Sequence, residues 1–304
     1  MAAVGGNIVR FTYTGAEGEI IPHGATHITV AEDCIFVRAR AFRRHSNIIE
    51  VICHDKVKKI EDRAFCCCDN LRRVIMPGVK IVERWAFADC KALTYVECGN
   101  LEIIGEYSFS GCECLGGIDL PSARIVEELA FTHCKTMKEV KFSNKLERID
   151  EGTFFDNRSL ECITIPLKDG IISNDTIFEE CYNLKQVHLV EGELNKTIAA
   201  LHLEEWRNDM GEEIDSINQI LPTTYAGRYM DDNDDEEYGG KAWAIRTWIR
   251  SVLGKIIHYQ AEHQLILDEA TTRLQLALPH DIVMNNVLSF LKLPSHFEVE
   301  EGIL

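Results

Sequence analysis

One motif recurs throughout the first two-thirds of the chain and constrains its fold more than any other feature. Seven phenylalanines mark it: Phe42, Phe65, Phe87, Phe109, Phe131, Phe154 and Phe178. Their spacing is nearly constant, with successive differences in sequence number of 23, 22, 22, 22, 23 and 24. Apolar residues recur six positions after each one, as Ile48, Leu71, Leu93, Leu115, Met137, Leu160 and Leu184. One such unit cannot bury its apolar side alone, whereas stacked units form a continuous core. The sequence therefore predicts a solenoid of about seven coils.

Each repeat also carries the pattern of a short β-strand. The positions nine and eleven residues after the phenylalanine are apolar, as Val74 and Met76 are in "LRRVIM". This spacing of two places both side chains on one face of a strand. The segment before each phenylalanine, such as "IEDRAF", predicts a second short strand or turn, followed by a helical turn or tight bend. At about 4.8 Å per coil, seven coils would be about 34 Å long.

A column of cysteines stands three residues after the phenylalanines, with His45 and Asn157 as its exceptions. Cysteine is small, apolar and easily buried, so it suits a cramped turn in a stacked core. We therefore predict a structural ladder made of Cys68, Cys90, Cys112, Cys134 and Cys181 together with Phe65, Phe87, Phe109, Phe131 and Phe154.

The run "CCC" at residues 66–68 raises the question of a metal or redox site. Zinc sites bring cysteines together in C-x₂₋₄-C pairs, and neither this run nor the pair Cys112 and Cys114 has that spacing. We expect Cys68 to belong to the ladder, and Cys66 and Cys67 to be partly exposed thiols on the turn. No metal and no cofactor are therefore expected, with metal or redox use of these thiols as the weaker alternative.

Composition limits the compartment and the partners. The twelve cysteines all lie between Cys34 and Cys181, and the start "MAAVGGNIVRF" lacks the basic and apolar regions of a signal peptide. We expect an intracellular protein, cytoplasmic or nuclear, with free and mostly buried thiols. No apolar stretch approaches the roughly 18 to 20 residues of a membrane span. The net charge of −17 argues against a nucleic-acid partner, which would require clustered basic residues.

Units such as "KIEDRAFCCCDNLRRVIMP" and "IIGEYSFSGCECLGGIDLP" closely resemble the BspA-like class of leucine-rich repeats, whose pattern is roughly I-G-x-x-A-F-x-x-C-x-x-L-x-x-V-x-L-P. The resemblance covers about residues 20 to 190. It implies an α/β repeat solenoid that serves as a non-catalytic protein–protein interaction scaffold, with no catalytic residues. The phosphate-binding, nucleophile-elbow and zinc-protease motifs are also missing from the sequence, so we do not expect an enzyme.

The residues seven, eight and ten positions after each phenylalanine are expected to point outward from the sheet. Arginine and tyrosine are the side chains that most often anchor protein interfaces. We predict a partner-binding patch made of Arg72, Arg73, Tyr95, Glu97, Asp119, Lys138 and Lys141. The alternative is a solvated sheet face whose mixed charges serve solubility.

We divide the chain into an N-terminal cap (1–35), the repeats (36–190) and a helical module (191–304). From residue 191 onward there are 21 acidic residues against 9 basic ones, and an acidic loop is expected at 228–240. Apolar residues at mostly helical intervals predict helices over 194–221 and 241–278, which would pair as an antiparallel hairpin. The helices could cap the core, recruit a second partner or form an oligomer through a coiled-coil contact.

The tail "LPHDIVMNNVLSFLKLP" (278–294) resembles the first helix of an F-box. That resemblance implies a substrate adaptor of a ubiquitin ligase as an alternative function. The simpler interpretation is a short amphipathic helix with proline in its first turn.

Overall fold

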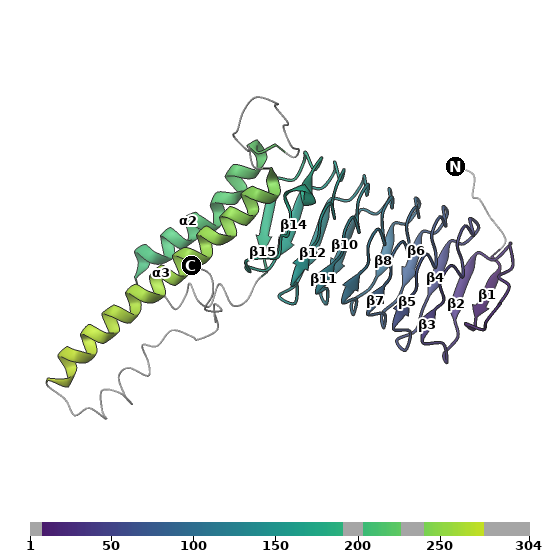
Figure 1. Cartoon of the computed structure of the whole chain (residues 1–304), viewed down its shortest axis with the longest axis horizontal. Helices are drawn as coiled ribbons and strands as arrows, with labels where there is room; N and C mark the ends of the chain where they lie inside the picture. The colour runs from purple at the N-terminus through teal and green to yellow at the C-terminus, as the bar shows by residue number, and fades with distance from the viewer. Residues whose placement is uncertain (1–7, 191–202, 226–239, 277–304) are drawn as a thin grey trace. The chain divides into compact units, whose positions relative to one another are not determined.

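The computed structural model describes residues 8–190, 203–225 and 240–276. The chain divides into two compact units, one of residues 1–190 with 218–246 and the other of residues 191–217 with 247–304. The first unit is a parallel β-solenoid (Figure 1). The predicted α/β repeat solenoid of about seven coils, followed by C-terminal helices, is thereby confirmed.

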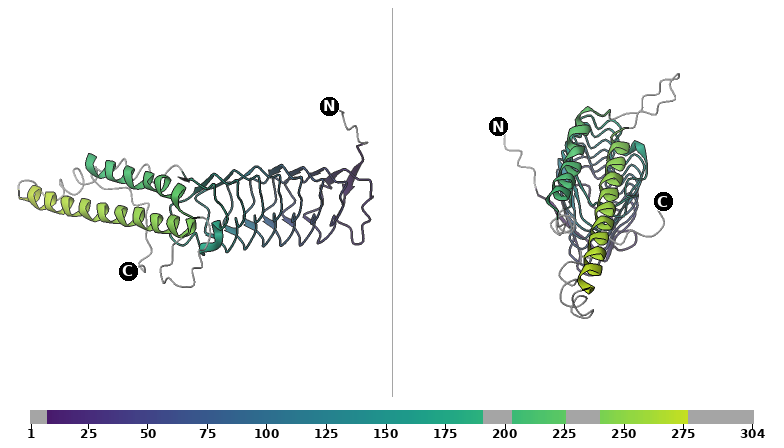
Figure 2. Two further views of the ribbon diagram at one scale, coloured as in Figure 1. Left: turned by 90° about the horizontal axis from the view of Figure 1, so that it is seen from above. Right: turned by 90° about the vertical axis from the view of Figure 1, so that its left-hand side faces the viewer.

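The solenoid has two walls of parallel strands, and the six coils from Phe42 to Phe154 contribute one strand to each wall. We call the wall with the longer strands the sheet face; it consists of β1 (Arg10–Tyr13), β2 (His27–Val30), β4 (Glu50–Ile52), β6 (Arg73–Ile75), β8 (Tyr95–Glu97), β10 (Gly117–Leu120), β12 (Glu139–Phe142), β14 (Cys162–Ile165) and β15 (Gln186–Leu189). The second wall consists of β3 (Phe36–Val37), β5 (Lys59–Ile60), β7 (Ile81–Val82), β9 (Ile103–Ile104), β11 (Ile125–Val126) and β13 (Arg148–Ile149). Figure 2 shows the successive coils stacked one behind another.

Tight turns join the walls, and each of the six coils from Phe42 to Phe154 places two residues there in left-handed backbone. In the second coil these are Arg63 and Cys67, with φ of 52° and 59°. The left-handed region costs a residue with a side chain roughly 1 kcal/mol or more. Hydrogen bonds to the next coil compensate: the Arg63 amide donates to the Arg84 carbonyl at 3.1 Å, and the Cys67 amide donates to the Ala88 carbonyl at 2.8 Å. In these six coils the connection is therefore a tight turn, whereas the last coil has a short 3₁₀ helix there, η1 (Asp175–Phe178).

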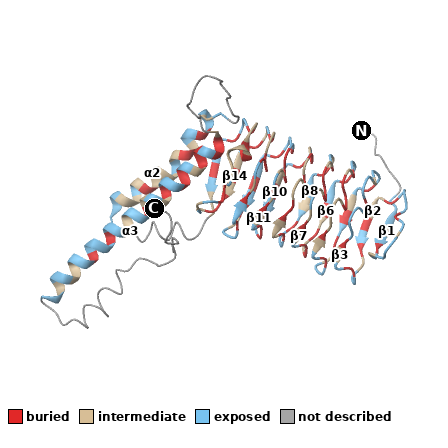
Figure 3. Ribbon diagram, viewed as in Figure 1, coloured by how far each residue is buried: buried red, intermediate tan, exposed pale blue. Residues whose placement is uncertain are grey.

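The phenylalanine rings form one stack through the core. Neighbouring rings from Phe42 to Phe178 have centroids 4.8 to 5.8 Å apart and planes within 12° of parallel. The strand spacing of about 4.8 Å sets this distance, because each coil contributes one ring. Tyr13 closes the N-terminal end, edge-on to Phe42 at 5.0 Å. Figure 3 shows the buried positions alternating with exposed ones along the strands.

The column cysteines lie beside this stack as hydrogen-bond donors between coils. The Sγ of Cys90 lies 3.2 Å from the carbonyl oxygen of Phe65, and the Sγ of Cys112 lies 3.3 Å from that of Phe87. Cys68, Cys134 and Cys181 make the same contact one coil back at 3.0 to 3.3 Å. All twelve cysteines are free thiols. Burial raises the pKa of Cys134 to about 12, so these thiols remain protonated donors at neutral pH.

Parallel stacking begins earlier than the predicted start of the repeats at residue 36. β1 and β2 lie in the segment 1–35, and β2 pairs in register with β4, His27 opposite Glu50 and Ile28 opposite Val51. This coil has Glu19 where the later ones have phenylalanine, which hid it from the repeat alignment.

The solenoid's last coil, which contains the 3₁₀ helix η1 (Asp175–Phe178), meets residues 218–246 of the same unit. The buried ammonium group of Lys241 donates to the carbonyl oxygens of Leu184 at 2.7 Å and Leu221 at 2.8 Å. The amide of Val187, on the edge strand β15, donates to the side chain of Asn218 at 3.0 Å. Leu221 opens the short 3₁₀ helix η2 (Leu221–Thr223). These polar contacts occupy backbone groups that a further coil would otherwise satisfy.

The second unit contains most of α2 (Glu204–Ile220) and α3 (Lys241–Gln275). Their pairing is antiparallel, because Trp206 stacks on Tyr259 at 5.2 Å while the Trp248 indole donates to the Glu213 carbonyl at 2.9 Å. Lys255 lies 2.9 Å from Asp209 and 3.1 Å from Glu213. Near the end of α3, Leu267 is buried, whereas the preceding Ile266 is 47% exposed.

Several predictions fall outside the described residues. They are the helical segment 194–202, nearly all of the acidic loop 228–240 and the F-box-like tail 278–294. Within the described ranges, no helix combines the length and apolar character needed to cross a bilayer.

Candidate partner-binding face

The seven residues predicted to bind a partner are all exposed. They lie on four neighbouring coils of the sheet face: Arg72 and Arg73 at β6, Tyr95 and Glu97 on β8, Asp119 on β10, and Lys138 and Lys141 at β12. The strand alternation explains this, since the intervening residues such as Val74 and Val140 point into the core. The register places Arg73 opposite Tyr95 and Asp119 opposite Lys141.

Arg73 joins three strands of this face. Its guanidinium carbon lies 5.3 Å from the centroid of the Tyr95 ring, and its Nη1 lies 3.5 Å from a Glu50 carboxylate oxygen. The Tyr95 hydroxyl lies 3.4 Å from a Glu97 oxygen. A cation over an aromatic face and an ion pair together hold a long side chain in one orientation. Arg73 and Tyr95 are therefore positioned before any partner arrives, although Tyr95 is 47% exposed.

Two residues next to this cluster were not included in the predicted patch. Ile49 and Ile52 are 37% and 36% exposed and flank Glu50 on β4. They occupy the same positions in their coil as Arg72 and Ile75 do in the next, so the repeat alignment alone could have found them. With them, the part of the sheet face on β4, β6 and β8 carries apolar and aromatic side chains around Arg73. We call this set (Ile49, Glu50, Ile52, Arg72, Arg73, Tyr95 and Glu97) the arginine–tyrosine patch.

The other half of the sheet face has a different character. Lys141 lies 3.0 Å from Glu139 on its own strand, and Lys138 lies 3.9 Å from Glu161 on the next coil. The hydrogen bond with Glu139 raises the pKa of Lys141. Such exposed pairs contribute little to stability or affinity, because water screens them. This half is a solvated surface of paired charges.

A break in the sheet separates the two halves. β8 closes a five-stranded sheet and β10 opens a four-stranded one, and the two strands do not pair. Gly116 and Gly117 lie at the break, where neither contributes a side chain, and a Cβ added at Gly116 would meet nothing within 4 Å. Just after β8, the Cys98 Sγ lies 3.8 Å from the Asp119 carbonyl oxygen of β10.

Two carboxylates of the same charge lie on the two strands that border this break. Glu97 and Asp119 occupy the same position in successive coils, ten residues after Phe87 and Phe109. Like charges on neighbouring strands are destabilising, and the ion pairs described above join opposite charges. The sheet face is thus open at Gly116, whereas a Cβ added at Gly117 would lie 3.2 Å from the Glu139 side chain; Tyr95, Glu97 and Asp119 stand beside this site.

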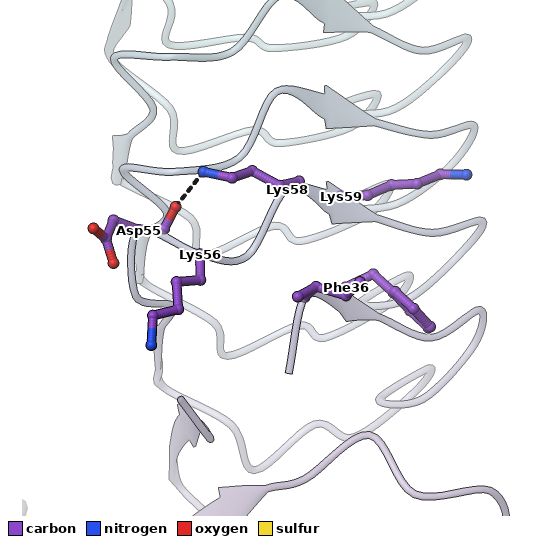
Figure 4. A pocket seen from close by; sticks show the side chains of 6 residues that line it. Phe36, Asp55, Lys56, Lys58 and Lys59 are labelled. Carbon is purple, nitrogen blue, oxygen red and sulfur yellow. Dashed lines mark hydrogen bonds between the residues drawn. The ribbon is translucent and has the colours of Figure 1, made fainter. Parts of the chain in front are cut away.

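A shallow depression of about 560 Å³ lies elsewhere in the solenoid, near β3 and β5 (Figure 4). Ile35, Phe36, Asp55, Lys56, Lys58 and Lys59 line it. The Lys58 ammonium donates to the Asp55 carbonyl at 2.5 Å, and Lys59 lies 2.6 Å from Glu83. The depression is wide open and shares no residue with the predicted patch.

A charged cluster on the turns of the last coils was not predicted. Asp156 accepts hydrogen bonds from His133 at 2.9 Å and Arg158 at 2.6 Å. Partial burial alone would raise the pKa of Asp156, but these two hydrogen bonds outweigh it and lower that pKa below its usual value. Among the described residues, no group of three or more histidine, cysteine, aspartate or glutamate side chains could hold a metal ion.

The comparison with protein-family models agrees with this architecture. The family model for the BspA type leucine rich repeat region matches residues 24–124 and 102–200, in six copies. The comparison with curated proteins found no match.

Similar solved structures include a leucine-rich repeat protein from Bacteroides ovatus, with 21% identity, 60% of this chain and 43% of that chain covered, and a TM-score of 0.44. The T. pallidum leucine-rich repeat protein has 18% identity, with 64% of this chain and 88% of that chain covered, and a TM-score of 0.42. The pneumococcal vaccine antigen PcpA has 15% identity, with 56% of this chain and 51% of that chain covered, and a TM-score of 0.46. The chain spans less than half the length of the Bacteroides ovatus protein.

The family match covers more than half of the chain, and residues 24–190 within it form the stacked coils described above. This chain belongs to the BspA type leucine-rich repeat family.

Proposed function

We propose that this protein is a non-catalytic interaction scaffold that binds a protein partner on the arginine–tyrosine patch. Family membership supports the general role, because leucine-rich repeats typically form protein-interaction scaffolds and not enzymes. The observation that carries the proposal is the fixed position of Arg73 between Glu50 and Tyr95, next to exposed Ile49 and Ile52.

The physical argument is preorganisation. Binding costs the entropy of every side chain that must be ordered, about 0.5 to 1.5 kcal/mol for each long one. On this patch the free protein already restrains Arg73 and Tyr95, and both lie on strands of a stacked core. Tyrosine and arginine surrounded by apolar groups are the composition of an interface hot spot.

The break beside the patch indicates the chemistry of the partner. Arg73 covers one face of the Tyr95 ring from β6, and on the other side of β8 the glycines of the next coil provide no side chain. A guanidinium or ammonium group from a partner could lie over Gly116 and Gly117, against Tyr95 and between Glu97 and Asp119. It would relieve the repulsion between the two carboxylates. We therefore expect a partner segment that presents arginine or lysine to this site.

In this proposal Asp119 helps to bind the arginine or lysine of the partner, whereas Lys138 and Lys141 lie at the edge of that site. Their pairing with Glu161 and Glu139 leaves them little free charge for a partner. Substituting either lysine is expected to change the association rate and its salt dependence more than the affinity.

The test is capture of partners from native cell lysate with the full chain as bait, quantified by mass spectrometry. Arg73→Glu and Tyr95→Ala should each release the same set of proteins that the wild type retains. Arg148→Glu is the matched control, because Arg148 is also an exposed strand arginine in an ion pair, 2.8 Å from Asp150, but lies on the second wall. Equal retention by all four baits would contradict the proposal.

A further inference from the structure

Two of the three consecutive cysteines have no part in the core ladder. Cys68 donates to the Phe42 carbonyl, whereas the Sγ atoms of Cys66 and Cys67 lie 3.5 Å from each other. In the other coils these two positions are Arg43 and Arg44, Ala88 and Asp89, Ser110 and Gly111, Thr132 and His133, Phe155 and Asp156, and Glu179 and Glu180. Since such varied residues satisfy the same turn, the fold itself does not require thiols there.

The backbone holds the two thiols on the same side of the chain. The Cys66 amide donates to the Arg63 carbonyl at 3.2 Å, and the Cys66 carbonyl accepts from the Arg44 amide at 2.8 Å. Cys67 has left-handed backbone, and its amide donates to the Ala88 carbonyl. Hydrogen bonds within the turn and to both neighbouring coils thus fix the spacing of a dithiol that extended backbone would place on opposite faces.

The distance between the sulfurs limits what they can bind. A disulfide requires an S–S distance of about 2.05 Å, which would draw the sulfurs together against those hydrogen bonds. Tetrahedral zinc, with Zn–S bonds of about 2.3 Å, spans two sulfurs at about 3.8 Å but needs two further ligands. The described residues provide no cluster of three metal-binding side chains. The ligand that fits is therefore an atom that bonds to both sulfurs with a narrow angle between the two bonds and that already carries its third substituent.

We propose that Cys66 and Cys67 form a two-thiol binding site for trivalent organoarsenicals. Trivalent arsenic is pyramidal, with bond angles smaller than the tetrahedral angle, so it holds two sulfurs closer together than zinc does. With an arsenoxide, R–As=O, both thiols give their protons to the oxygen, two As–S bonds form, and one water molecule leaves. Arsenic stays trivalent, and neither an oxidant nor a reductant is consumed.

The two thiols have different accessibility, which sets the order of the steps. Cys67 is partly exposed and meets the reagent first, whereas Cys66 is only 6% exposed. Burial and the contact with Cys67 raise the pKa of Cys66 to about 11. Its reaction is nevertheless favoured, because after the first bond forms the second is intramolecular. The exposed Cys114 and the half-buried Cys162 can each form only a single bond.

The experiment is titration of the reduced full-length protein with phenylarsine oxide, followed by gel filtration and intact mass spectrometry. We expect one retained adduct per chain, with the mass expected for loss of one water. A dithiol such as 1,2-ethanedithiol should remove it, and an equal concentration of a monothiol should not. Losing the chelate in Cys66→Ser or Cys67→Ser should raise the half-saturating concentration by about 10²-fold or more.

Cys114→Ser is the matched control and should bind like the wild type. If Cys66→Ser does not fold, Cys67→Ser decides alone, because that position is partly exposed. Unchanged retention in a folded Cys67→Ser variant, or no retained adduct in the wild type, would overturn the proposal.

Discussion

The ammonium nitrogen of Lys241 lies 2.7 Å from the carbonyl oxygen of Leu184, at the C-terminal end of the repeat core. Only 2% of the lysine is exposed, and burial lowers its pKa from 10.5 to about 8. A charged group thus takes the place where another coil would stack.

Stability should depend on pH through this lysine. Below pH 8 it is protonated in both the folded and the unfolded chain, so the cost of burying the charge is fully present. Between pH 8 and 10.5 the folded chain releases the proton and the unfolded chain keeps it, so the free energy of unfolding rises with pH. The gain is at most about 3 kcal/mol. Urea unfolding of the wild type and Lys241→Met, compared at each pH, should show a difference that grows in this window; parallel curves would contradict it.

The ladder cysteines should make the free energy of unfolding depend on pH in the opposite direction. Burial raises the pKa of Cys134 from 9.0 to about 12, so above pH 9 its thiol ionises in the unfolded chain but not in the folded one. The free energy of unfolding should therefore fall with pH by up to about 1.4 kcal/mol per pH unit from this group. Cys134→Ala removes the contribution, and the difference between wild type and variant should shrink between pH 9 and 12. A constant difference would show that the thiol does not titrate as described.

Removing a ring from the phenylalanine stack should be severe. Phe109 is fully buried, 5.2 Å from Phe87 and 5.3 Å from Phe131. Phe109→Ala should cost about 3 to 5 kcal/mol, because it leaves a cavity that the flanking coils cannot close. Tyr95→Ala, on the exposed sheet face, should change stability much less. Chemical unfolding of both variants checks this, and an unchanged midpoint for Phe109→Ala would refute the repeat register.

Asn157 stands at a position of the ladder where most of the other coils have cysteine, and its side chain makes two hydrogen bonds to the preceding coil where a cysteine makes one. Its amide donates to the Phe131 carbonyl at 3.0 Å, while its oxygen accepts from the Cys134 amide at 2.7 Å. Asn157→Leu leaves both backbone groups buried without partners, at a cost of about 1 to 3 kcal/mol each. Asn157→Cys keeps the contact with Phe131 and should destabilise less. Equal destabilisation by both substitutions, measured by urea unfolding, would show that the size of the side chain at position 157, and not its hydrogen bonding, determines its contribution to stability.

The repeat spacing made much of the fold predictable, because each interval between neighbouring column phenylalanines is one turn of the solenoid. The columns nine and eleven residues after the phenylalanine likewise indicated which strand residues point inward. The coil at β2 escaped the alignment because Glu19 stands in the phenylalanine position. The burial of Lys241 could not be foreseen, since it depends on carbonyl oxygens that belong to Leu184 and Leu221.

The candidate site was predictable only in part for the same reason. Alternation along a strand indicates exposure, so Arg73 and Tyr95 could be selected as outward residues. Their contact depends on strand register and side-chain orientation, as does the contact between the Cys66 and Cys67 thiols. Gly116 and Gly117 can be read from the sequence, but the unpaired strands beside them appear only in the structure.

Site-specific photo-crosslinking in the native cell tests the central claim most directly. A photoreactive residue is placed at Ile52, within the arginine–tyrosine patch, or at Thr164, the same position of its coil on β14. We predict that the chain labelled at Ile52 crosslinks to a protein partner and that Tyr95→Ala abolishes the product, while the chain labelled at Thr164 gives none. Crosslinks from Thr164 alone, or a product from Ile52 that persists in Tyr95→Ala, would contradict binding on this patch.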